Sequence, residues 1–311
     1  MTATSVTAAS ATPGRDLPRP RRRRRRNWTG WGFLSPFLAV FLLALVAPVL
    51  YALYLSFFQD KLIGGNRFAG LANYKQALSD AQFWSAFERV ALFLVVQVPV
   101  MLILALAIAM ALDSARLHWA PLFRLSIFLP YAVPAVVASL MWGFMYGTQF
   151  GLIGNLDRWL HTTLPDPFSS GLVLPAIGNI VTWEYVGYNM LIFYSALRVI
   201  PAELYEAAEL DRVGPFRVIW HIKLPSVRGA ILIATIFSII GSFQLFNEPN
   251  ILKPLSPDTI SSYFTPNMYA YNLSFAGQEY NYSATIAIIM GVATMVIAYL
   301  VQRAGTRKRE A

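Results

Sequence analysis

The feature that most constrains the fold is a set of six apolar runs, each long enough to cross a bilayer as a helix. A membrane-spanning helix needs about 20 mostly apolar residues. Only the fourth of these runs contains a charged residue, Glu184. The runs are 33–58, 90–112, 125–147, 171–197, 229–247 and 280–302. The sequence therefore predicts an all-α polytopic membrane protein with six transmembrane helices.

Composition agrees with this class and excludes others. The chain is 56% hydrophobic and only 13% charged, and it contains no cysteine. A disulfide framework, a thiolate metal site and a cysteine nucleophile are therefore excluded. The net charge of +9 is typical of some nucleic-acid-binding proteins. Here, however, the basic residues flank apolar runs, which indicates a role in membrane orientation, and we expect no nucleic-acid partner.

The distribution of basic residues predicts the orientation in the cytoplasmic membrane. Residues 1–29 are expected to form a disordered basic tail, and the six arginines at 21–26 to anchor it beside anionic membrane lipid. Of the 25 Lys and Arg residues, 19 fall on the side of this tail, which predicts that both termini are cytoplasmic. Residues 306–311 then form a basic cytoplasmic tail. The run 33–58 is too long for a signal peptide and should remain as a transmembrane helix.

A polar stretch at 201–225 interrupts the apolar chain between the fourth and fifth runs. It reads as two short helices joined by a turn at 211–214. The first should begin with Pro201 as its first helical residue. The second should begin at Pro215, end at Pro225 and carry one apolar face, formed by Phe216, Ile219, Trp220 and the stem of Lys223.

Within this stretch, Glu206-Ala207-Ala208 and, further on, Ile222, Leu224 and Pro225 resemble the EAA loop of the permease subunits of binding-protein-dependent ABC importers. The resemblance implies a cytoplasmic EAA coupling loop at 199–228 that docks into a groove of an ATPase subunit. The coupling residues would be Glu206, Ala207, Ala208, Asp211, Gly214, Ile222, Leu224 and Pro225. The alternative is an ordinary cytoplasmic loop with two amphipathic helices.

This chain departs from the family pattern at one position of the loop. The family has glycine six residues after the glutamate, where this chain has Arg212. We expect Gly214, two positions later, to supply the positive φ that the turn requires.

Further segments resemble the carbohydrate-uptake branch of the family, particularly permeases for small oligosaccharides such as lactose or cellobiose. These segments are GLANYKQAL after the first run, GSFQLFNEPN at 241–250, YAY at 269–271 and YNYSA at 280–284. The resemblance covers roughly 30–305 as a permease domain. It implies a heterodimer with a second permease subunit, an ATP-binding cassette ATPase dimer and an extracytoplasmic solute-binding protein. A non-sugar solute, such as a glycerol-phosphate or a polyamine-like compound, is the alternative.

The fourth run carries polar and aromatic residues that lipid would not favour. Glu184 lies near its middle, where a carboxylate costs at least about 2.5 kcal/mol unless it faces water, a partner or a polar ligand. We therefore predict a substrate path formed by Trp183, Glu184, Tyr188, Asn189, Gln244 and Asn247. The alternative is that Glu184 pairs with polar groups of a neighbouring helix and only holds the bundle together.

Prolines and connecting segments complete the expected architecture. Pro99, Pro130 and Pro134 are expected to kink or break the second and third helices. The outer segments 59–87, 146–167 and 248–279 either contact the binding protein or simply connect the helices.

Several absences argue against catalysis by this chain. The sequence has no G-x-x-x-x-G-K-[ST] run, so ATP hydrolysis is expected on a separate subunit, and no cofactor is expected. His118, His161 and His221 are far apart in the sequence, which gives no support to a metal site. A secondary transporter would need internal repeats, and a membrane enzyme a convergent set of reactive residues; neither pattern is found in the sequence.

Overall fold

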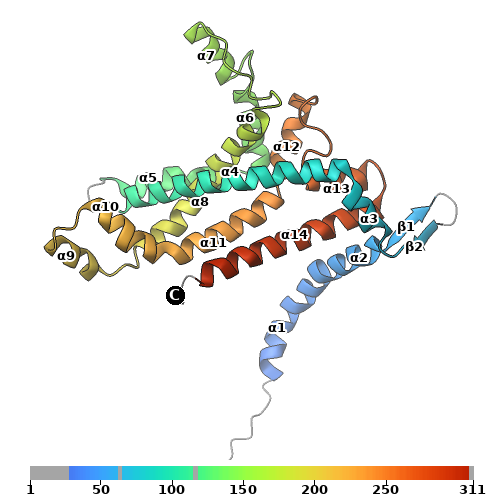
Figure 1. The fold of residues 1–311 in the computed structure, drawn as a ribbon, viewed down its shortest axis with the longest axis horizontal. Helices are drawn as coiled ribbons and strands as arrows, with labels where there is room; N and C mark the ends of the chain where they lie inside the picture. The colour runs from blue at the N-terminus through green and yellow to red at the C-terminus, as the bar shows by residue number, and fades with distance from the viewer. Residues whose placement is uncertain (1–27, 62–64, 115–117, 308–311) are drawn as a thin grey trace, which may run out of the picture. The chain divides into compact units, whose positions relative to one another are not determined.

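The computed structural model describes residues 28–61, 65–114 and 118–307. Most of these residues are helical (Figure 1). Most of the expected basic tail at 1–29 and the end of the tail at 306–311 lie outside the described residues. The first predicted span corresponds to α1 (Trp28–Phe41), a π-helical turn η1 (Leu42–Val46) and α2 (Ala47–Ser56). Residues 49–311 form one compact unit, which contains every site considered below.

Four long helices build that unit. They are α4 (Ala81–Leu112), α8 (Val173–Leu197), α11 (Leu224–Phe243) and α14 (Tyr280–Arg307). Buried apolar side chains of α4, α8 and α11 form one core, and those of α4, α11 and α14 form another. Figure 1 shows α9 and α10 near one end of α4, and α3, α13 and a β-hairpin near the other. The long helices therefore connect two ends of the bundle.

The start of α4 is fixed by a carboxylate. Asp80 caps the helix through hydrogen bonds from the backbone N–H groups of Gln82 and Phe83 to its Oδ1. Its Oδ2 accepts hydrogen bonds of 2.6 Å from the hydroxyls of Tyr269 and Tyr282. Burial opposes ionisation of Asp80, but these four hydrogen bonds outweigh it and hold the pKa of the carboxyl below its usual value. Asp80 thus ties α4 to α13 (Pro266–Phe275) and α14.

Prolines act differently in the second and third predicted spans. α4 continues through Pro99, so the helix is not broken there, and a kink at Pro99 stays a prediction. The third span is α5 (Ala120–Phe128), a 3₁₀ turn η2 (Leu129–Ala132) and α6 (Ala135–Met145), bent by 97°. Pro130 lies in the 3₁₀ turn and Pro134 caps α6, which confirms the predicted break. α7 (Leu152–Leu160) follows.

The described residues contain four helical runs long and apolar enough to cross a membrane, or five if the bent pair counts as one crossing. The four are Trp31–Ser56, Ala81–Leu112, Arg228–Leu255 and Tyr280–Thr306. α8 coincides with the fourth predicted span and, at 25 residues, is about 37 Å long, but it is not among these runs. The count of six crossings therefore stays a prediction.

The polar stretch forms α9 (Ala202–Leu210), α10 (Pro215–Val218) and a π-helical turn, η3 (Ile219–Lys223). Pro201 is the N-cap of α9 and not its first helical residue. The prediction that Pro225 ends the second helix is wrong, because the chain continues from η3 into α11 in helical conformation. The wider turn of η3 resets the hydrogen-bond pattern, so Pro225 lies at the start of α11, where its missing N–H is not needed.

All three predicted connecting segments contain regular structure, and α7 is that of the segment 146–167. The strands β1 (Phe58–Lys61) and β2 (Gly65–Phe68) pair antiparallel and are followed by α3 (Ala72–Ser79). α12 (Asn247–Leu252) and the 3₁₀ turn η4 (Lys253–Leu255) precede α13. The second span is longer than predicted, since α4 already begins at Ala81.

Candidate functional site

The geometry of the turn between α9 and α10 explains why glycine would be favoured at position 212. The N–H of Val213 donates to the carbonyl of Ala208, and the N–H of Arg212 donates to that of Glu209. This is the Schellman ending of a helix, in which the residue after the cap takes a left-handed conformation. Arg212 has that conformation, with φ of 50°, whereas Gly214 has φ of −66°. The expectation that Gly214 supplies the positive φ is wrong; Arg212 does so, at a cost of about 1 kcal/mol relative to glycine.

The predicted coupling residues occupy two different environments. Glu206, Ala207, Asp211 and Gly214 are exposed around α9 and its turn. Ala208 is buried, and the three residues at the end of η3 and the start of α11 are half-buried: Ile222, Leu224 and Pro225. The first group is thus available to a partner, while the second faces the remainder of this chain.

Large apolar side chains are exposed on the same loop. Leu210 at the end of α9 is 85% exposed, and Leu204 is also exposed. Phe216 and Trp220, from the predicted apolar face, are exposed and lie with ring centroids 6.0 Å apart. Leu204 and Leu210 were missed by the helical-face pattern because they lie on α9, where only the Glu-Ala-Ala residues were singled out. Solvent-exposed apolar side chains of this kind are typical of a protein-binding surface.

An ion pair joins the loop to the end of α4. The Lys223 ammonium, at the end of η3, lies 2.7 Å from Oδ2 of Asp113, the residue that caps α4. Lys223 also lies 5.7 Å from the centre of the Tyr205 ring of α9. Burial, followed by the charge of Asp113, raises the pKa of the Tyr205 phenol, although Arg198 opposes the shift. Tyr205 is therefore a neutral side chain at physiological pH.

A cavity of about 330 Å³ lies further along the bundle, between α4, α8, α11 and α12. Among the predicted path residues, Tyr188, Asn189, Gln244 and Asn247 line it. Trp183 is not in the lining; its ring meets that of Trp142 on α6 at 5.9 Å, edge to face. These six residues therefore do not all share one surface.

Glu184 is buried and is not part of the cavity lining. Its side chain is only 3% exposed, and its Oε2 has no hydrogen-bond partner among the described residues. Glu248 of α12, which does line the cavity, is close enough to interact electrostatically with it. A buried carboxylate oxygen without a partner is costly, which makes a bound group or a movement of this region a natural way to satisfy it.

The predicted path omitted many lining residues, among them two tyrosines and a second carboxylate. Tyr131 of η2 stacks on Tyr188 with ring centroids 4.8 Å apart, and Tyr185 also lines the cavity, as does Glu248. The tyrosine stack depends on close packing of α5 against α8. At Gly187 an added Cβ would lie 2.0 Å from the carbonyl oxygen of Ile127, so only glycine fits. The proline pair around Tyr131 was a signal for a bend but not for its direction.

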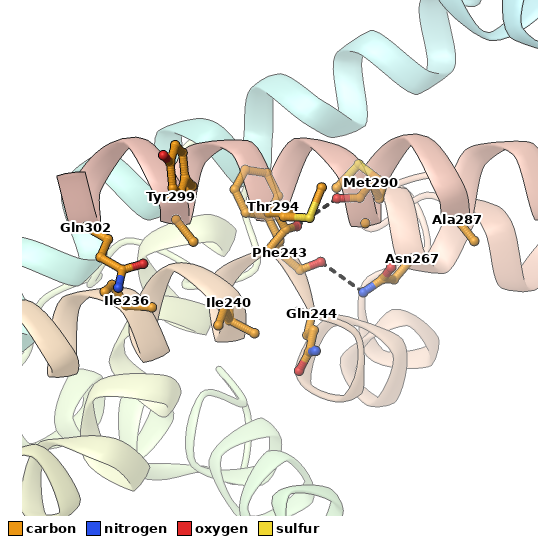
Figure 2. Close-up of a pocket in the computed structure, with 13 residues that line it drawn as sticks. Ile236, Ile240, Phe243, Gln244, Asn267, Ala287, Met290, Thr294, Tyr299 and Gln302 are labelled. Atoms are coloured by element: carbon orange, nitrogen blue, oxygen red, sulfur yellow. Dashed lines mark hydrogen bonds between the residues drawn. The ribbon is translucent and has the colours of Figure 1, made fainter. Parts of the chain in front are cut away.

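A groove of about 650 Å³ runs between α11 and α14 (Figure 2). Its lining on α14 includes the small residues Ala287, Gly291, Thr294 and Ala298. A Cβ added at Gly291 would meet nothing within 4 Å, so no packing against the described residues explains the glycine. Small residues with open space above them are typical of a surface where another membrane helix packs closely.

The groove and the cavity share one lining residue. Gln244, at the end of α11, lines both. In Figure 2 its amide points away from α14. The polar cavity therefore lies next to the apolar groove along α11.

Comparison with known proteins identifies relatives over nearly the whole chain. The family described as "binding-protein-dependent transport system inner membrane component" matches residues 82–310. The lactose transport system permease protein of Rhizobium radiobacter is 31% identical, over 89% of this chain and 94% of that protein. The diacetylchitobiose uptake system permease protein of Streptomyces coelicolor is 29% identical, over 91% of this chain and 84% of that protein.

A solved structure has the same fold. It is that of a bacterial ABC transporter involved in the import of the acidic polysaccharide alginate. The TM-score is 0.80 at 18% identity, over 91% of this chain and 96% of the matched chain. The resemblance of the fold therefore extends beyond the matched family region.

Proposed function

Because this chain belongs to the family of binding-protein-dependent transport system inner membrane components, we propose that it moves a small oligosaccharide across the cytoplasmic membrane as the permease subunit of an ABC importer. It is a multi-pass membrane protein. Its permease domain spans roughly 30–305, between the basic tails 1–29 and 306–311. Both termini are cytoplasmic, in keeping with the 19 of 25 basic residues that fall on their side.

The observation that carries the mechanism is the continuous helical path from the loop to the cavity. η3 runs directly into α11, whose far end supplies Ser238, Ser242 and Gln244 to the cavity lining. A displacement of the loop is therefore transmitted along a helix to the cavity wall. Energy comes from a separate ATPase dimer that docks on the loop at 199–228, and closure of that dimer switches the cavity between inward-facing and outward-facing states.

The substrate class rests on the relatives and on the chemistry of the cavity. The two relatives described above are named as permease proteins for lactose and for diacetylchitobiose uptake. The cavity offers tyrosine rings, which suit the C–H faces of sugars. Its amide groups can donate hydrogen bonds to hydroxyls and accept them, and its carboxylate can accept them. The acidic Glu248 favours a second candidate, a cationic polyamine-like solute.

A test of the substrate class compares uptake in cells with and without the gene for this chain. We expect loss of uptake of radiolabelled lactose or cellobiose, restored by the wild-type gene, with unchanged uptake of spermidine. Loss of spermidine uptake together with normal uptake of oligosaccharides would instead favour the cationic solute.

The remaining partners are a second permease subunit and an extracytoplasmic solute-binding protein. The groove between α11 and α14 supports the second permease, because its small residues leave room for a foreign helix. Since Gln244 joins the groove to the cavity, solute would pass between the two permeases. The binding protein would deliver solute at the end of the bundle that holds Asp80, the hairpin and α13.

A larger side chain at position 291 is expected to block assembly with the second permease subunit without destabilising this chain. The Cβ of a leucine at position 291 would meet no atom of the described residues within 4 Å, and leucine is a better helix former than glycine. The single chain should therefore stay stable. Its side chain would, however, fill the groove. We expect Gly291→Leu to be inserted at wild-type abundance but to elute without the second permease in size-exclusion chromatography of the detergent-extracted complex.

Gly187→Ala is the matched control for that experiment. Its Cβ would collide with backbone of α5, so the chain itself should lose about 1–3 kcal/mol of stability and fall in abundance. Normal assembly of Gly291→Leu would show that the groove is not the permease interface.

A further inference from the structure

Asp113 and Lys223 lie 110 positions apart in the sequence but form an ion pair of 2.7 Å. Their side chains are only 9% and 14% exposed, respectively. Within the part of the chain that the structure describes, it is the one salt bridge. The pair joins the end of α4 to the last residue of η3.

Two physical facts make this pair more than a surface contact. The carboxylate of Asp113 lies at the C-terminus of α4, where the helix dipole disfavours negative charge. It is also largely removed from water, which penalises the charge further unless a partner compensates it. The Lys223 ammonium supplies that compensation and also lies near the Tyr205 ring of α9. Both arms of the loop thus meet the end of α4 at one point.

The two joined elements both lead to the cavity and line it. α4 contributes Phe93, Gln97, Val98 and Met101 to the lining, while α11, which continues from η3, contributes Phe237, Ser238, Gly241 and Ser242. Without the pair, a movement of the loop would act on α11 by direct helical continuity and on α4 only through apolar packing. Apolar packing alone is less specific in direction than a hydrogen-bonded ion pair.

We propose that the Asp113–Lys223 pair is a positioning clamp that makes α4 follow the coupling loop together with α11, so that the parts of the cavity lining on both helices move in one step. The clamp rests on the proposed function, since it acts in transport only if an ATPase moves the loop. Neither residue belongs to the predicted coupling set. Lys223 and Asp113 act through other groups and do not touch the solute.

The test uses the full transporter in liposomes and measures solute uptake and ATP hydrolysis in the same preparation. Lys223→Met and Asp113→Asn each remove one charge with little change of shape. We expect uptake per ATP hydrolysed to fall by about tenfold, within the range usual for coupling between sites. The exchange Asp113→Lys with Lys223→Asp should restore most of the ratio, because it rebuilds the pair and suits the helix dipole better.

Arg303→Met is the control, because it removes a positive charge from an exposed site on α14, outside the loop at 199–228. It should leave the ratio unchanged. The clamp is overturned if the single variants keep the wild-type ratio, if uptake and hydrolysis fall in parallel with abundance, or if the exchanged pair does not recover. If the wild-type complex takes up no solute in this assay, the proposed function is contradicted. Failure of the clamp and failure of the proposed function therefore give different results.

Discussion

Replacing Ala207 by tryptophan is expected to abolish uptake while leaving the chain in the membrane at wild-type abundance. Ala207 is exposed on α9 and makes no contribution to the buried core, so the single chain tolerates a larger side chain. A docked ATPase would not tolerate it, since a steric penalty of about 1.4 kcal/mol already weakens an association about tenfold. Glu206→Lys should act similarly by reversing a charge at the contact. Uptake and co-purification of the ATPase are the measurements.

Ala202→Trp is the matched control for this loss. Ala202 is exposed at the first position of the same helix, but it lies on another face than Ala207, since five residues turn an α-helix by about 140° beyond one full turn. We expect near-normal uptake and docking for this variant. Equal uptake by Ala207→Trp and wild type at equal abundance would mean that α9 is not the docking element.

Removing the tyrosine stack is expected to have the second large effect. Tyr188→Ala takes away the ring that stacks on Tyr131 in the cavity and should lower transport by about tenfold, which corresponds to about 1.4 kcal/mol of lost interaction with solute. Glu248→Gln keeps the shape of the side chain but removes its charge, and should change the preference among solutes. Initial rates of uptake for several oligosaccharides provide the measurement.

Tyr194→Ala controls for the loss of a tyrosine from α8. Tyr194 does not line the cavity and instead lies against Arg124, 4.8 Å from its guanidinium carbon. Its removal should leave solute preference unchanged. If Tyr188→Ala transports with wild-type rate and preference at equal abundance, the cavity is not on the solute path.

Glu184→Gln distinguishes the two interpretations of that carboxylate. If Glu184 belongs to the path, the variant should lower transport or alter preference while the transporter remains assembled. If Glu184 only holds the bundle together, assembly should fall and the surviving complexes should transport normally. Glu184 is buried and interacts electrostatically with Glu248, which lines the cavity. Assembly and transport should therefore be measured in the same preparation.

Local features of the sequence predicted much of the architecture. Uncharged runs located the long helices because lipid excludes charge, and Pro130 and Pro134 located the break in the third span. The continuity of η3 with α11 was missed because Pro225 normally ends a helix, and only a shift of hydrogen-bond register makes it acceptable there. Arg212 was passed over since arginine rarely takes a positive φ.

Long-range contacts could not be predicted in the same way. No local pattern links Asp113 to Lys223, because their meeting depends on how α4 and η3 end in space. Similarly, Glu248 and Tyr131 line the cavity only through the placement of α12 and the direction of the 97° bend. The helical periodicity of α8 places Glu184 and Tyr188 on one face, but in the structure Tyr188 lines the cavity whereas Glu184 is buried outside its lining.

The central claim is that the loop at 199–228 is cytoplasmic and covered by an ATPase. Leu210 is 85% exposed, and the chain has no cysteine. In the variant Leu210→Cys, the introduced thiol is therefore the one cysteine of this chain that a thiol reagent can label. With a membrane-impermeant maleimide, we expect no labelling of intact cells, strong labelling of inverted vesicles stripped of peripheral subunits, and protection in vesicles that retain the ATPase. Labelling from outside intact cells, or equal labelling with and without the ATPase, would contradict the account.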